Sequence, residues 1–305
     1  MGAARGLLAL AAASAAVGAA GRALTPAPTR WLDLAGRRVA LTESGAGPAI
    51  LFLHGLGGQA GNFHRLTPLL PDFRCLVFDR PGSGWSDAAA PGAAGLEGHA
   101  ASAAALIEAL GAGPALVVGH SLGGAIALRL ALDRPDLVAG VVGIGALTGP
   151  QAPELAALGA GIGRRPLLRE AGVRLLSAPL APVLAPLFLK ASFAPEPLPP
   201  GFAIPGGLYA GLAPRMAAAL LRDLEGVADG APRLRADLPG LSRPVTLVHG
   251  IDDHVLAAAT HALPAALAIP EADLWLPRGG HMLPATQPGL TATAIRAAAT
   301  RAGLA

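Results

Sequence analysis

Short apolar runs bounded by Gly, Pro or Asp recur along most of the chain. They alternate with stretches of helical length, and this order predicts parallel strands joined by crossover helices. Continuous apolar strands of this kind suit a sheet that is covered on both faces. The predicted strands are Ala49–Leu53, Phe73–Phe78, Pro114–Val118, Leu137–Ile144, Pro244–Val248 and Ala272–Leu276, and the predicted helices are His99–Leu110, Leu122–Leu132, Ala257–Ala268 and Ala292–Arg301.

Two segments fall outside this alternation. Near the start, Trp31–Leu34 and Val39–Leu41 flank a turn and predict a hairpin. Residues 148–241 are dense in Pro, Leu, Ala and Gly, which predicts a mainly helical cap inserted over the sheet. We therefore expect one core, made of residues 31–147 and 242–305, because a single α/β domain with an insertion can reach this length.

The N-terminal 22 residues resemble a secretory signal or a membrane anchor. Arg5 is followed by an uncharged, Ala- and Leu-rich stretch at 6–21, with small residues that could serve signal peptidase. This stretch is shorter than the ~20 apolar residues that usually cross a bilayer. We expect residues 1–22 to export or anchor the protein on the periplasmic side, with a cytoplasmic location as the alternative, and residues 23–30 to form a linker.

Composition excludes several classes of function. Hydrophobic residues make up 52% and charged residues 14%, which excludes a disordered chain. The net charge is only +3, the arginines are scattered and aromatic residues are 4%, so we expect no nucleic-acid partner. The single cysteine, Cys75, cannot form a disulfide within the chain or a thiolate metal site. We expect no metal and no organic cofactor; the nearest candidate metal ligands, His249 with residues 252–254, are a weak match.

The pentapeptide Gly119-His120-Ser121-Leu122-Gly123 carries the strongest chemical signal. It directly follows a predicted strand and directly precedes a predicted helix. A sharp strand-to-helix turn holds its central Ser with the hydroxyl projecting, and the flanking glycines let the chain pack closely there. Ser121 is therefore the predicted nucleophile.

A serine hydroxyl needs a base, and the base needs a carboxylate that orients it. In the chain order Ser, acid, His, the acid should follow the penultimate strand and the base the last one. His281 follows Gly279-Gly280 after the last predicted strand and is the expected base. Asp253 is the expected acid, favoured over its neighbour Asp252 by the Gly-x-x-Asp spacing.

Acyl transfer also needs two N–H donors for the oxyanion. We expect one to be the amide of Leu122, at the start of the helix. The other is expected from Leu56, in the glycine-rich loop 54–58 that follows the first parallel strand; a plain tight turn is the alternative for that loop.

These motifs together resemble the cap-bearing α/β-hydrolase superfamily over residues 31–303. The likeness includes bacterial members with an N-terminal hydrophobic leader, and it implies a mostly parallel eight-stranded sheet, flanked by helices, with a helical cap. The motifs that carry it are His54-Gly55, the segment Asp79–Ser86, the Ser121 turn, Asp253 and His281. In such families the segment 79–86 is chiefly structural, and we interpret His54 and His120 as scaffold residues.

The resemblance implies a serine hydrolase that cleaves a small-molecule ester. Serine at the nucleophile position argues against epoxide hydrolases and haloalkane dehalogenases, which carry Asp there. The same residues could act on another bond or acceptor, as a carbon–carbon hydrolase, a perhydrolase or an acyltransferase, and a binding protein without turnover is a further alternative. The leucines and phenylalanines of 148–241 suit an apolar substrate, although they could equally pack the cap onto the sheet.

Overall fold

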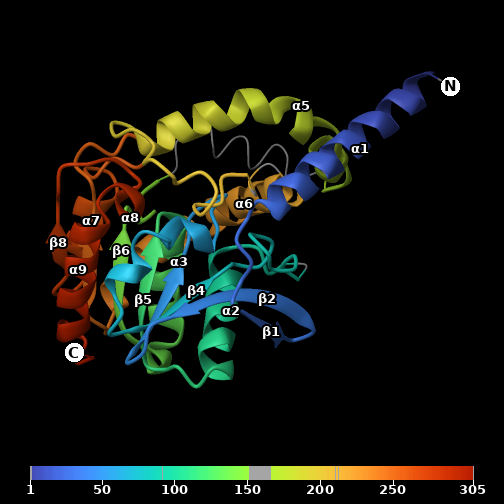
Figure 1. The fold of residues 1–305 in the computed structure, drawn as a ribbon. Helices are drawn as coiled ribbons and strands as arrows, with labels where there is room; N and C mark the ends of the chain where they lie inside the picture. The colour runs from blue at the N-terminus through green and yellow to red at the C-terminus, as the bar shows by residue number, and fades with distance from the viewer. Residues whose placement is uncertain (1, 91, 151–165, 210, 212, 305) are drawn as a thin grey trace.

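The computed structural model describes residues 2–90, 92–150, 166–209, 211 and 213–304 (Figure 1). Within them, eight strands form one sheet in the order β1-β2-β4-β3-β5-β6-β7-β8. The strands are β1 Arg30–Leu34, β2 Arg37–Ser44, β3 Ala49–Leu53, β4 Arg74–Phe78, β5 Ala115–His120, β6 Val138–Ile144, β7 Val245–Val248 and β8 Asp273–Trp275. The helices are α1 Gly2–Ala23, α2 Leu96–Ala109, α3 Leu122–Asp133, α5 Pro166–Phe193, α6 Pro214–Asp237, α7 Ala262–Ala268, α8 Leu283–Thr286 and α9 Pro288–Arg301.

The predicted mostly parallel sheet is confirmed. β1 and β2 pair antiparallel, β2 and β4 pair antiparallel, and every other neighbouring pair is parallel. β3, β5, β6 and β7 therefore end at the same edge of the sheet, where ligands of open α/β sheets usually bind.

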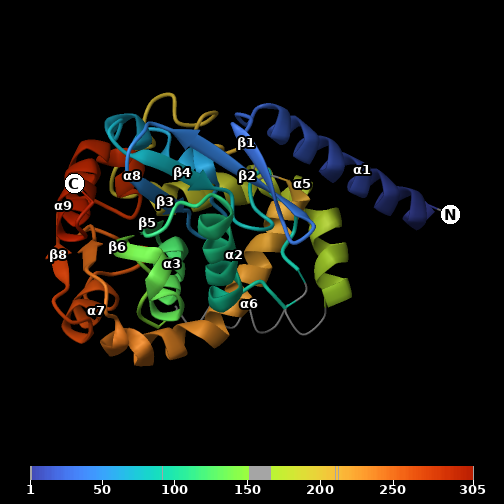
Figure 2. The same ribbon diagram turned by 90° about the horizontal axis from the view of Figure 1, so that it is seen from below.

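Alternate residues of the strands fill two cores. In β3, Leu51 and Leu53 face the core under α2 and α3, whereas Ile50 and Phe52 face the core under α9. All four side chains are fully buried. Both faces of the sheet are thus covered, as Figure 2 shows from below, and this explains why the strands are continuously apolar.

Four predicted elements have wrong boundaries. α2 begins at Leu96 and α9 at Pro288, before the predicted His99 and Ala292. The hairpin strand β2 runs well past the predicted Val39–Leu41, because its polar second half pairs with β4. The helix predicted from Ala257 begins only at Ala262. His261 is held by the loop after β6, since Thr148 Oγ1 donates to His261 O at 2.7 Å and Gly149 N donates to His261 Nδ1 at 2.8 Å.

The segment at 2–22 is helical, and the described part of 148–241 contains two long helices joined by a turn-rich stretch. α1 covers the predicted leader, and its Arg5–Ala23 stretch is long and apolar enough to cross a membrane, judged by length and composition. α5 and α6 occupy much of 148–241, which we call the cap segment; residues 151–165 of it lie outside the described part.

β3 and α3 approach each other with no space for a side chain between them. A Cβ on Gly123, the second residue of α3, would overlap the carbonyl oxygen of Leu53 at the end of β3. A Cβ on Gly119 would likewise overlap the carbonyl of Gly123. The turn between β5 and α3 is therefore packed main chain against main chain.

We predict that Gly123→Ala lowers the free energy of unfolding by about 1–3 kcal/mol, because the new methyl group must displace backbone. Gly289 is the matched control: it is the second residue of α9, and a Cβ there meets nothing within 4 Å. Gly289→Ala should leave stability within about 1 kcal/mol of wild type, or raise it. Chemical denaturation of both variants checks this, and equal stability of the two would contradict the close-packing account.

Candidate active site

Ser121 occupies the turn between β5 and α3 in a strained conformation. Its φ of 56° and ψ of −119° are rarely adopted by residues other than glycine. Its amide donates to Ile144 O at 2.9 Å, and its carbonyl accepts from Leu147 N at 3.1 Å. These bonds to β6 and the loop after it hold the backbone, and the residue itself is partly exposed.

The structure brings Asp253 and His281 together. Asp253 follows β7 and His281 follows β8, and His281 Nδ1 lies 2.7 Å from Asp253 Oδ2. The other carboxylate oxygen, Oδ1, accepts the amides of Val255 and Leu256 at 2.8 Å each. Both residues are buried, so the pair is shielded from water.

The hydrogen-bond partners of Asp253 determine its charge. Burial by itself raises the pKa of Asp253, but hydrogen bonds from His249 and His281 and from the Leu256 amide outweigh burial and hold the pKa well below its usual range. The ionised carboxylate can only accept, so Nδ1 of His281 carries the proton. Its other ring nitrogen, Nε2, is then free to accept one.

His249 also contacts Asp253, and the sequence did not predict this contact. Its Nε2 lies 2.6 Å from Leu256 O and 3.4 Å from Asp253 Oδ2. It sits directly after β7, four residues before Asp253, and that spacing was the only signal that could have placed it there.

Asp252 has a different role from Asp253. Its Oδ2 accepts the amide of Gly279 at 3.1 Å, and its own amide donates to Gly279 O at 3.0 Å. Glu196, which follows α5, accepts the amide of Gly280 at 3.0 and 3.2 Å. Two carboxylates thus hold the glycines that precede His281, and the contact from Glu196 could not be read from the sequence.

His120 directly precedes the predicted nucleophile, Ser121, in the chain, and its ring packs on the predicted base. Its ring centroid lies 4.8 Å from that of His281, and its Nε2 lies 2.9 Å from His281 O. Burial lowers the pKa of His120 to about 3, so the ring is neutral at physiological pH. His120 therefore supports the position of His281 and cannot take a proton readily.

The loop 54–58 lies directly against Ser121. A Cβ on Gly55 would lie 2.9 Å from Ser121 Cβ. The loop is turned by a bond from Gly58 N to Gly55 O of 3.2 Å. Leu56 lies in this turn, one residue after Gly55, and Leu122 is the first residue of α3, directly after Ser121.

A buried charge network holds this loop to the cap segment. The guanidinium of Arg80 donates to His54 O at 3.1 Å, to Gly55 O at 2.9 Å and to Asp223 Oδ2, on α6, at 2.9 Å. His99 Nε2 lies 2.8 Å from Asp223 Oδ1. Burial raises the pKa of Asp223, but the charge of Arg80 and the contact with His99 outweigh it and hold that pKa well below its usual range. An ionised pair therefore links the cap to the loop.

The segment 79–86 is held by hydrogen bonds between its side chains and backbone groups. Asp79 accepts the amides of Ala60 and Trp85 at 2.7 and 2.8 Å. Ser86 Oγ donates to Asp79 O at 2.5 Å and accepts from Ala40 N at 2.9 Å. Burial raises the pKa of Asp79 to about 6. Neither side chain contacts Asp253 or His281 through a described hydrogen bond.

Part of the cap segment packs against the loop that carries His281. Phe193 and Phe202 form a buried cluster with Met282 and Ala285, beside His281. Some of the apolar cap residues singled out from the sequence therefore do pack the cap onto the core. Others are exposed, above all Leu187 at 61%, whereas the side chains of Leu167, Leu168, Leu176 and Leu184 lie outside the described part.

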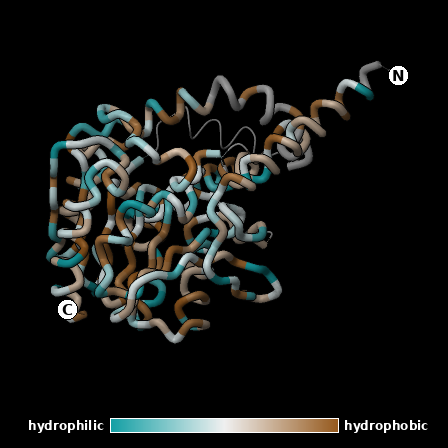
Figure 3. Tube along the Cα trace, viewed as in Figure 1, coloured by the Kyte–Doolittle hydropathy of each residue, from teal (hydrophilic) through white to brown (hydrophobic). Residues whose placement is uncertain are grey.

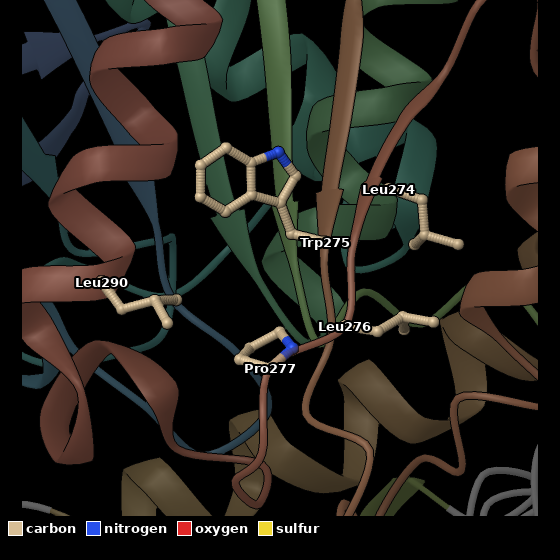
Figure 4. Close-up of a pocket in the computed structure, with 5 residues that line it drawn as sticks. All are labelled: Leu274, Trp275, Leu276, Pro277 and Leu290. Carbon is tan, nitrogen blue, oxygen red and sulfur yellow. The ribbon is translucent and has the colours of Figure 1, made fainter.

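A shallow apolar hollow lies away from these residues, at the β8 end of the sheet. Figure 4 shows its lining of Leu274, Trp275, Leu276, Pro277 and Leu290. It contains no acid, base or nucleophile. In the part of the chain that the structure describes, no three His, Cys, Asp or Glu side chains are grouped so as to hold a metal ion.

A family model and individual protein sequences both match this chain. A family model described as the alpha/beta hydrolase fold matches residues 48–288. The chain is 34% identical to the magnesium-chelatase 30 kDa subunit of Rhodobacter capsulatus over 247 residues, which are 78% of this chain and 81% of that protein. It is 42% identical to lipase LipV of Mycobacterium tuberculosis over 98 residues, 32% of this chain and 37% of that protein.

Among solved structures, the chain resembles an esterase from Thermogutta terrifontis. The TM-score is 0.74 at 22% identity, and the match covers 90% of this chain and 99% of the esterase. At this identity the likeness shows the fold alone.

Proposed function

Since the chain belongs to the alpha/beta hydrolase fold family, we propose that it is a serine hydrolase that cleaves a carboxylic ester through an acyl-enzyme on Ser121. The observation that carries the proposal is the bond between His281 Nδ1 and Asp253 Oδ2, with His281 packed on the residue next to Ser121. A hydroxyl in a strained turn, a buried base and a buried ionised acid are the parts that nucleophilic acyl transfer requires.

The proposed reaction has two steps. His281 Nε2 takes the proton of Ser121 Oγ as the oxygen attacks the ester carbonyl, and the same nitrogen then protonates the departing alcohol. Water, activated by His281, releases the acid and restores Ser121. The amides of Leu56 and Leu122 stabilise the oxyanion in both steps, and the charge of Asp253 stabilises the imidazolium.

We further propose that the substrate is a small molecule with an apolar part and that α1 associates the protein with a membrane, as an anchor or export segment. The cap segment supports the first point, because its Phe193 and Phe202 form an apolar cluster with Met282, next to His281. The length and composition of α1 support the second.

We predict that the protein hydrolyses p-nitrophenyl esters and that Ser121→Ala lowers turnover by about 10⁴-fold or more, because the residue supplies the attacking oxygen. A panel of rising acyl length, followed by absorbance, gives the rate and sizes the acyl pocket. Unchanged turnover in the variant would refute the nucleophile assignment.

Labelling with a fluorophosphonate separates the alternatives. Wild-type protein that is labelled at Ser121 but turns over no ester would retain the three residues and indicate another bond or acceptor. Binding of an ester without labelling or turnover would indicate a binding protein.

We predict that Asp253→Asn lowers kcat by about 10²–10⁴-fold, because an amide cannot hold His281 in the same tautomer or stabilise its charge. Asp252→Asn is the matched control, as it changes the neighbouring carboxylate, whose described contacts go to Gly279 and Arg278 and not to His281. Its loss should stay within about tenfold, the effect of one weakened hydrogen bond. Equal losses would reassign the acid.

A second candidate function comes from the Rhodobacter capsulatus relative, with which the chain shares 34% identity over most of both proteins. We propose as the alternative that this chain acts as a subunit of a magnesium chelatase. The two proposals are compatible if the hydrolase reaction is what the chelatase requires.

Complementation distinguishes the roles. In R. capsulatus lacking its 30 kDa subunit, we expect this chain to restore magnesium-chelatase activity and Ser121→Ala to fail. Restoration by both would indicate a subunit whose hydrolase site is not needed. Restoration by neither would refute the magnesium-chelatase role, and the hydrolase proposal would then stand by itself.

A further inference from the structure

The N-terminal helix is packed onto the cap segment by one face. Among the residues 5–23, Ser14, Gly18 and Gly21 are buried, and so is Thr25, two residues past the end of the helix. The buried positions therefore recur every three or four residues. A Cβ on Gly18 would lie 2.9 Å from Pro214 Cδ, at the start of α6, and α1 also packs along α5. α1 is thus a docked element of the folded protein.

The rest of α1 is apolar and uncovered. Only 17% of the Arg5–Ala23 stretch is buried, and Leu7 and Leu8 are 51% and 71% exposed. Figures 1 and 2 show α1 leaving the body of the protein with the N-terminus at its far end, and Figure 3 shows apolar residues along it. Such a surface is costly in water and suited to a lipid environment.

Tryptophan and arginine side chains gather where α1 meets the core. The guanidinium of Arg22 lies 4.4 Å above the ring of Trp85, and Trp85 and Trp31 contact edge to face at 6.4 Å. Arg38 lies 5.2 Å from the ring of Trp31, and Trp85 Nε1 donates to Pro26 O at 2.9 Å. We call Arg22, Trp31, Arg38 and Trp85 the collar.

Tryptophan is enriched at the level of lipid headgroups, where its ring is apolar and its N–H is wet, and arginine reaches the same level with its charge. The exposed leucines lie between Arg5 and the docked Ser14, a stretch of about 13 Å that can enter one leaflet of the ~30 Å hydrocarbon core. Both features favour a bilayer over a second copy of the chain as the partner of α1.

We propose that α1 is retained in the mature protein, that its uncovered leucine surface sits in a lipid bilayer, and that the collar lies at the headgroup level. This inference rests on the membrane association proposed above. It fixes the hydrolase against the membrane with α5 and α6 beside the lipid, so an ester dissolved in the bilayer would reach the cap without crossing water.

The three tryptophans of the chain make the inference testable. Trp31 and Trp85 belong to the collar, whereas Trp275 is in β8, at the opposite end of the sheet. Full-length protein is reconstituted into vesicles of phosphatidylcholine and phosphatidylglycerol whose acyl chains are brominated near the headgroup. We expect strong fluorescence quenching in Trp275→Phe, which keeps the collar pair, and no quenching in the double variant Trp31→Phe with Trp85→Phe.

A matched glycine pair tests docking separately from insertion. Gly18→Leu should push α1 off the cap, so the protein still floats with vesicles but quenching of the collar pair falls towards that of Trp275. Gly6→Leu adds the same side chain where a Cβ meets nothing within 4 Å, and should leave quenching unchanged. Flotation without collar quenching in the Trp275→Phe protein would overturn the proposal.

Two further outcomes would also overturn it. A mass showing loss of the first 20 or so residues during expression would identify α1 as a cleaved leader, and absence of flotation would remove the membrane association itself. If the fluorescence of the collar tryptophans is shielded equally with and without vesicles, and the protein can be crosslinked as a dimer, the partner of α1 is a second copy of the chain. Fluorophosphonate labelling of Ser121 in the same samples reports on the hydrolase proposal independently, and circular dichroism confirms that each variant is folded.

Discussion

The contact between the end of β3 and the start of α3 constrains the rest of the site. The two main chains approach so closely that Gly123 has no space for a Cβ beside Leu53 O. This contact turns the chain sharply at Ser121, fixes its φ at 56° and places the loop 54–58 against it. A nucleophile candidate and both candidate oxyanion donors are therefore positioned by backbone, which reorganises little during a reaction.

A buried ion pair connects the cap segment to the loop 54–58 beside that turn. Arg80 holds two carbonyls of the loop 54–58 and the carboxylate of Asp223 in the cap segment. Removing one partner of such a pair leaves an uncompensated charge, which typically costs about 3–5 kcal/mol. Movement of α6 would therefore disturb the geometry of the loop 54–58, which contains the proposed oxyanion donor Leu56.

The proposed membrane contact gives the cap a second neighbour. α1 docks on α5 and α6 through small residues, and α6 carries Asp223. Lipid, cap and loop 54–58 would then form one continuous series of contacts. An apolar ester would meet the aliphatic residues of the cap before it reached Ser121.

The sequence by itself determined the alternation of strands and helices, the sharp turn at Ser121 and the chain order of Asp253 and His281. The first two are local properties, since apolar period and glycine placement are set by neighbours along the chain, and the third follows from the order of the strands. Only the tertiary structure decided the start of α7, the length of β2 and the contacts of His249, Glu196, Arg80 and Asp223. Each of these joins residues far apart in the chain or depends on burial, and a pattern read along one chain contains neither the distance nor the dielectric environment that makes such contacts form.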